Sequence, residues 1–137
     1  MLTLQKGEIS IEFIALIGFI LVIFTSMIIV IGLKNKDISD SMIYSDAQKI
    51  ADTVASEINT AARIEGYYRE FEIPRKIAGM ENYSVNISTD FRFVQVKWDN
   101  KNEMSNIVTE NVSGTINPGL NKIRNEEGMI IIESIEG

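Results

Sequence analysis

Glu8 and Glu12 lie four residues apart, directly before an apolar segment, residues 13–33, that contains no charged side chain and only one threonine and one serine. About 20 apolar residues in a helix cover the roughly 30 Å hydrocarbon core of a bilayer. Residues 11–33 are therefore long enough to span a membrane. An ionised carboxylate at the entering end of such a span is costly unless it stays at the interface or finds a partner. The chemistry expected of Glu12 is pairing with a positive group.

The apolar segment has two interpretations. In the first it is an uncleaved signal anchor, in which Lys6 is a short positive region and Glu12 extends to the lipid headgroups. A cleaved secretory signal fits less well, because the segment is longer than the usual 7 to 15 apolar residues and no clear cleavage site precedes Lys34. In the second interpretation the processing site lies before the segment, which then stays with the mature protein.

Residues at fixed spacing favour the second interpretation. They are Lys6, Gly7, Glu8, Ser10, Glu12 and Leu16. Their pattern resembles the class III signal peptide of archaeal type IV pilins, in which the cleaved glycine is followed by Q-x-S-x-E-x-x-x-L. The resemblance covers the first third of the chain, and it departs from the family at Glu8, where glutamine is usual. It implies that a prepilin peptidase cuts between Gly7 and Glu8 on the cytoplasmic side.

The resemblance also implies a function. The chain would be a structural subunit, a major or minor pilin, of an archaeal type IV pilus-like surface filament that serves adhesion. Its partners would be the prepilin peptidase, the membrane before assembly and like subunits in the filament. Cleavage would leave a free amine on Glu8, and an amine among apolar helices needs a counter-charge, which Glu12 can supply from one helical turn away. The alternative function is an uncleaved, single-pass anchored domain outside the cytoplasm that binds a ligand or partner.

Composition excludes several other classes of function. The 137 residues include no histidine and no cysteine, so catalytic triads, imidazole or thiolate metal sites and disulfides are excluded. The net charge is −6, without the basic patch that nucleic-acid binding needs. The carboxylate pairs Glu70 with Glu72 and Glu126 with Glu127 could do acid/base work, but solvated charge explains them better. We therefore expect neither an enzyme nor a cofactor.

Three N-x-S acceptors for N-linked glycosylation follow later in the chain, at Asn82, Asn86 and Asn111. They fit a domain that is exported while the N-terminus stays inside. The alternative is that they are ordinary polar positions of strands.

The pattern of apolar residues predicts a helix that continues beyond the membrane segment. Apolar residues recur every three or four positions after residue 34, at Ile38, Met42, Ile43, Ala47, Ile50, Val54, Ile58 and Ala61. No proline or glycine interrupts residues 34–65, and Gly66 is a natural stop. The expected organisation is a leader at 1–7, an apolar helix at 8–33, its amphipathic continuation at 34–66 and a β head domain at 67–137.

Alternating apolar and polar residues predict strands in the head domain. They are expected at 67–74, 83–88, 91–98 and 129–135, with a less regular one in 104–116 that points Val108 and Val112 inward, whereas 120–124 is ambiguous. Turns are expected at 89–90, 99–102, 117–119 and 125–128. The predicted fold class is α+β, in which a long N-terminal helix packs its second half on a small antiparallel sheet of four or five strands.

Overall fold

The computed structural model describes the backbone of residues 2–135 and the side chains of residues 10–135. One helix, α1 (Leu2–Arg63), is followed by seven strands. The chain divides into two compact units, Met1–Asp40 and Ser41–Gly137. The second unit contains the last turns of α1 and all the strands, and from here on this unit is called the head.

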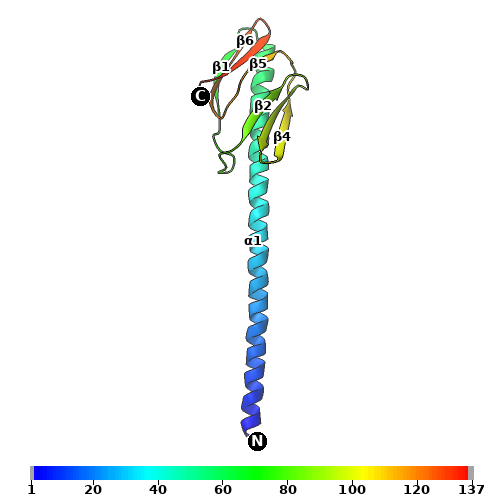
Figure 1. Ribbon diagram of the computed structural model, residues 1–137, viewed down its shortest axis with the longest axis vertical. Helices are drawn as coiled ribbons and strands as arrows, with labels where there is room; N and C mark the ends of the chain where they lie inside the picture. Colours follow the sequence, from blue (N-terminus) through cyan, green and yellow to red (C-terminus); the bar gives the residue numbers. More distant parts are fainter. Residues whose placement is uncertain (1, 136–137) are drawn as a thin grey trace. The chain divides into compact units, whose positions relative to one another are not determined.

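The strands of the second unit form two sheets (Figure 1). Four strands pair in the order β1-β6-β7-β5, and three pair in the order β2-β3-β4. Their bounds are β1 (Tyr68–Ile73), β2 (Ser84–Ser88), β3 (Phe93–Trp98), β4 (Lys101–Asn106), β5 (Val112–Gly114), β6 (Gly119–Glu126) and β7 (Met129–Ser134). All neighbours are antiparallel except β5 and β7, which are parallel. The α+β class is confirmed.

The core of the second unit lies between α1 and the inner faces of the sheets. From α1 it takes a face of mostly small residues: Ala47, Ile50, Ala51, Val54, Ala55, Ile58 and Ala61. Alternate strand residues complete it, among them Phe71, Val94, Val96, Ile123, Ile130 and Ile132. Alanines on the helix allow close approach of the strands, so that branched side chains can fill the space between them. The predicted helix face is confirmed for residues 47–61, whereas Ile38 and Met42 are exposed.

The strand number and one strand position differ from the prediction. Seven strands are present where four or five were expected, and the ambiguous residues 120–124 belong to β6. The single irregular strand expected at 104–116 is wrong, because β4 ends at Asn106 and β5 begins at Val112. Asn59 of α1 explains the break: its Oδ1 accepts the N–H of Val108 at 2.8 Å and its Nδ2 donates to the carbonyl of Asn106 at 3.3 Å.

That bonding to the helix leaves Val108 exposed rather than directed inward. The turn expected at 99–102 is also shorter than predicted, because Trp98 pairs with Lys101 and leaves only two residues between the strands. Of these, Asp99 has a positive φ of 46°, which suits a tight two-residue hairpin turn.

Candidate functional site

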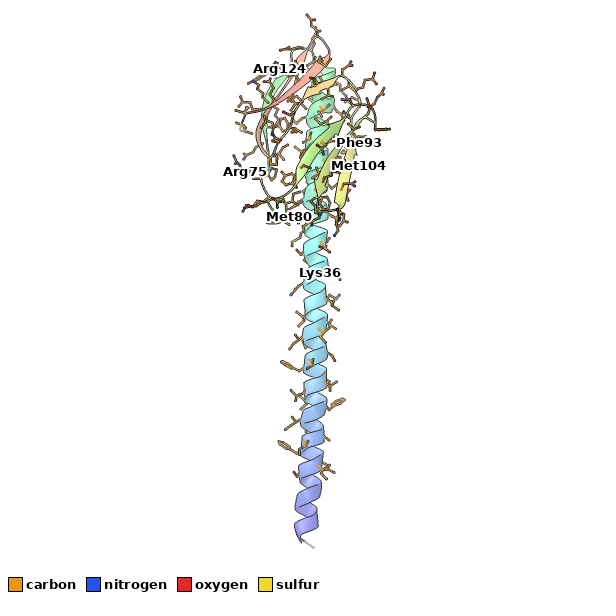
Figure 2. All side chains as sticks on the ribbon, in the orientation of Figure 1. Lys36, Arg75, Met80, Phe93, Met104 and Arg124 are labelled. Atoms are coloured by element: carbon orange, nitrogen blue, oxygen red, sulfur yellow. The ribbon has the colours of Figure 1, made fainter. Side chains whose placement is uncertain are left out.

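The apolar segment of α1 is the candidate functional site, because its large side chains are left exposed within the described residues 10–135. From residue 13 to 33 their exposed fractions range from 43% at Ile17 to 66% at Ile14. The side chains project from the helix on all sides before Lys36, which is labelled in Figure 2. Within residues 10–135, the helix Ser10–Arg63 is the one helix long and apolar enough to cross a membrane, by length and composition. Such a surface needs an apolar partner from outside the chain.

The two hydroxyl side chains in this segment are already satisfied. Thr25 donates its Oγ1 hydrogen to the carbonyl of Leu21, and Ser26 donates its Oγ hydrogen to that of Val22, both at 2.8 Å. A hydroxyl bonded to the carbonyl four residues earlier presents no unpaired donor to its surroundings. The segment is therefore compatible with hydrocarbon along its whole length, or with a bundle of similar helices.

Glu12 is the only charged residue in 9–33. Its side chain is exposed, as are those of Ser10 and Leu16, the other motif residues with described side chains. No side chain among residues 10–135 bonds to the Glu12 carboxylate. The remaining motif residues, Lys6, Gly7 and Glu8, lie outside the residues whose side chains the structure describes, so cleavage at Gly7 and pairing with the Glu8 amine stay predictions.

A different carboxylate, that of Glu57, is buried between α1 and the strands. Its Oε1 lies 2.8 Å from the guanidinium of Arg69, and its Oε2 accepts the Tyr67 hydroxyl at 3.0 Å. The Glu57 residue is only 9% exposed, and burial raises the pKa of the Tyr67 phenol. With both oxygens occupied, Glu57 ties α1 to the start of β1 and is not arranged for proton transfer.

Two buried asparagines fix the chain reversals, and sequence patterns did not single them out. Asn125 donates to the carbonyls of Ala61 at 2.7 Å and Ile64 at 3.1 Å, which gives each of these carbonyls a second donor where α1 ends, and its Oδ1 accepts the N–H of Gly128. Asn121 bonds the backbone of the predicted turn at 117–119. A signal for Asn125 exists in retrospect: it is a polar residue at an inward position of an alternating strand.

The remaining predicted residues lie on the surface. The sequon residues Asn82, Asn86 and Asn111 are exposed. Glu70 and Glu72 are both exposed, and Glu126 and Glu127 lie exposed at the turn between β6 and β7.

No group of three or more acidic residues within 10–135 is arranged to hold a metal ion. No protein-family model matches this chain, and no curated protein or solved structure matches it either. What the chain does must therefore be inferred from its own residues.

Proposed function

We propose that this chain is a structural subunit of a surface filament of the archaeal type IV pilus kind, anchored in the membrane before assembly. One observation carries the proposal: a helix exposes apolar side chains on all sides over residues 13–33 and has a single carboxylate, Glu12, just before them. The pattern from Lys6 to Leu16 supports it, because it matches the processing and assembly motif of such subunits at every position except Glu8. The chain acts by assembly and not by catalysis.

The proposed mechanism has two steps. A prepilin peptidase cleaves between Gly7 and Glu8 on the cytoplasmic side, and the apolar helix then leaves the bilayer for a bundle of like helices. Both environments are apolar, so transfer between them exposes little hydrocarbon surface to water. Glu12 provides the counter-charge for the new amine, on its own helix or a neighbouring one. The strand-containing part of the head, residues 67–137, faces outward and serves adhesion.

The mature N-terminus is the first test. Intact-mass measurement and N-terminal sequencing of the native protein, purified from filaments, are expected to show Glu8 as the first residue. A filament protein that begins at Met1 or Leu2 would contradict the proposal. That result would favour the alternative, an uncleaved single-pass anchor for a domain that binds a ligand or partner outside the cell, which the apolar segment alone would explain.

Glu12→Ala tests the assembly role separately from folding. The variant should be cleaved and inserted in the membrane as the native chain is, yet be lost from filaments, because the buried amine would lack its counter-charge. Asp37→Ala is the matched control, since it removes an exposed carboxylate of the same helix outside the apolar segment. Filaments that contain normal amounts of the Glu12→Ala variant would refute the pairing role.

A further inference from the structure

The two sheets of the head have four edge strands within the described residues: β1 and β5 in one sheet, β2 and β4 in the other. An edge strand presents unpaired N–H and C=O groups, which can pair with a strand of another molecule. Proteins limit this hazard with charged side chains, prolines, bulges, short strands or a covering group. The four edges of this head differ in which protection they have.

Two edges are protected by charge. β1 contains Arg69, Glu70 and Glu72 and is followed by Pro74, and β4 contains Lys101 and Glu103. The other two edges have no charged residue and no proline. β2 is Ser-Val-Asn-Ile-Ser and β5 is Val-Ser-Gly.

All three sequons lie at the uncharged edges. Asn82 precedes β2 by two residues, Asn86 is the central residue of β2, and Asn111 directly precedes β5. The charged edges, β1 and β4, contain no sequon. Each of the four edges therefore has either charged residues in its strand or a sequon in or directly beside it, and no edge strand has both.

The uncharged edge of β2 also lines a groove, which the end of β5 and the loop after it close on the other side. Residues 83–87 form one wall and residues 114–118 the other, around a volume of about 360 Å³. Within the described residues no strand pairs with β2 on this side, nor with β5 on the side away from β7. A strand from another molecule would find the unpaired edge of β2 on one wall. On the other wall Thr115 and Asn117 are bonded within the chain and Pro118 has no N–H, so β2 is the edge that the groove exposes.

The sequon asparagines are available for modification. Asn82, Asn86 and Asn111 are exposed, and none of their side-chain amides is hydrogen-bonded to another described residue. The asparagines whose amides hold the fold together are different ones, Asn59, Asn121 and Asn125, and none of these is in a sequon. Modification of the first set would break no contact of the head.

We propose that Asn82, Asn86 and Asn111 carry N-linked glycans that cover the groove and the two uncharged edges. In the modification, the amide Nδ2 displaces the phosphate from the anomeric carbon of a lipid phosphate-linked oligosaccharide. A C–N bond forms, the C–O bond to phosphate breaks, the amide proton goes to a base and the lipid phosphate leaves, with no change in oxidation state. The glycans are bulky and hydrated, so they exclude a pairing strand where no charge does so.

This inference requires only that the head is outside the cytoplasm, a requirement that the filament proposal and its alternative share. Tryptic peptides of the native protein test it directly. Residues 77–92 contain Asn82 and Asn86, and residues 102–122 contain Asn111. Both peptides should be found with added sugar mass, and an unmodified form of either as the main species would overturn the proposal. The filament proposal is tested at a different place, the mature N-terminus, so the two can fail independently.

The covering role is tested with two full-length triple variants purified in detergent. Both replace Asn82 and Asn111 with glutamine; one carries Asn86→Gln and the other Asn86→Lys. The first lacks glycans and edge charge, and light scattering should show association at a several-fold lower concentration than for the glycosylated protein. The second restores a charge to β2 and should return toward the native behaviour. If the first variant stays as dispersed as the glycosylated protein, at equal helix content by circular dichroism, the glycans do not protect the edges.

Discussion

The apolar residues of the two parts of α1 have different partners. In residues 47–61 they form one face, and Ile50, Val54 and Ile58 are each no more than 4% exposed against the strands of the same unit. In residues 13–33 they surround the helix, and all the large ones are at least 43% exposed. One continuous helix thus combines a half whose partners are in its own chain with a half whose partners must come from outside.

This difference separates two kinds of mutational effect. Changes in the second half of α1 and its contacts should lower the stability of the head. Changes in the apolar segment should leave the head folded and alter only membrane insertion or assembly. The only tryptophan of the chain, Trp98, is 3% exposed in the head core and packs edge-on against Tyr44 with ring centroids 5.1 Å apart, so its fluorescence reports unfolding of the head alone.

The largest difference is expected between two isoleucine truncations. Ile58 is completely buried, so Ile58→Ala should lower the free energy of unfolding of the head by about 3–5 kcal/mol, through lost burial and the cavity left behind. Ile20→Ala, at a position 53% exposed, should change it by less than about 0.5 kcal/mol. Urea titration of the full chain in detergent, followed by Trp98 fluorescence, measures both. Equal effects of the two variants on the free energy of unfolding would show that the two parts of α1 do not differ in their contribution to the stability of the head.

Two glycines offer the second contrast. Gly114 in β5 has a φ of +108°, and a Cβ there would collide with the backbone carbonyl of Ile132 in β7. Gly114→Ala should therefore cost about 2–3 kcal/mol of head stability, because neither strand can move without losing their parallel pairing. Gly18 has nothing within 4 Å, so Gly18→Ala should leave head unfolding unchanged. A Gly114→Ala head as stable as the native one would show that β5 is not held by this close approach.

Features with a repeating pattern were predictable from the sequence. The spacing of Ala47, Val54 and Ile58 predicts the buried helix face, and the alternation of Val94, Val96 and Trp98 predicts the inward face of β3; all six side chains are buried. The apolar segment was predictable because it is long and uncharged. The helix face and the strand face follow from the spacing of apolar residues along the chain, which matches the 3.6-residue period of a helix and the two-residue period of a strand.

Features set by single long-range contacts were not predictable. The break between β4 and β5 depends on Asn59, 49 residues before the N–H of Val108 that it binds. The parallel β5–β7 pair depends on a glycine that admits close contact, and no period marks either feature. For the candidate site, the sequence predicts a charge pairing for Glu12 and cleavage between Gly7 and Glu8, and both stay predictions because the structure does not describe the side chains of Gly7 and Glu8.

A smaller effect is expected at the junction of α1 and β6. Asn125→Ala removes the bonds to the carbonyls of Ala61 and Ile64 and the acceptor for Gly128, and should lower head stability by about 1–3 kcal/mol, because three hydrogen bonds of a buried side chain are lost. Asn100→Ala, at an exposed turn, is the control and should have no measurable effect. The same urea titration distinguishes them. No loss for Asn125→Ala would mean that water replaces the asparagine at this helix end.

The smallest effect concerns an ion pair on the solvent face of the four-stranded sheet. Nζ of Lys122 lies 2.6 Å from Oε2 of Glu133. This hydrogen bond is the main cause that lowers the pKa of the Glu133 carboxyl below its ordinary value of 4.5, and the positive charge of Arg124 lowers it further. A lowered pKa in the folded state means that the carboxylate contributes stability above pH about 4.5, and that this contribution is lost as the pH falls through the folded-state pKa.

Lys122→Met removes the main cause of the lowered pKa. Its urea midpoint should therefore fall below that of the native chain at pH 7, by a small amount because both side chains are about a third or more exposed. The difference should stay constant down to pH about 4.5 and shrink below it, as Glu133 is protonated in both proteins. Since residues 13–33 contain no charged side chain, the same pH change should not alter the apolar segment. A difference that persists at pH 3 would assign the effect of Lys122 to packing of its methylene groups and not to its charge.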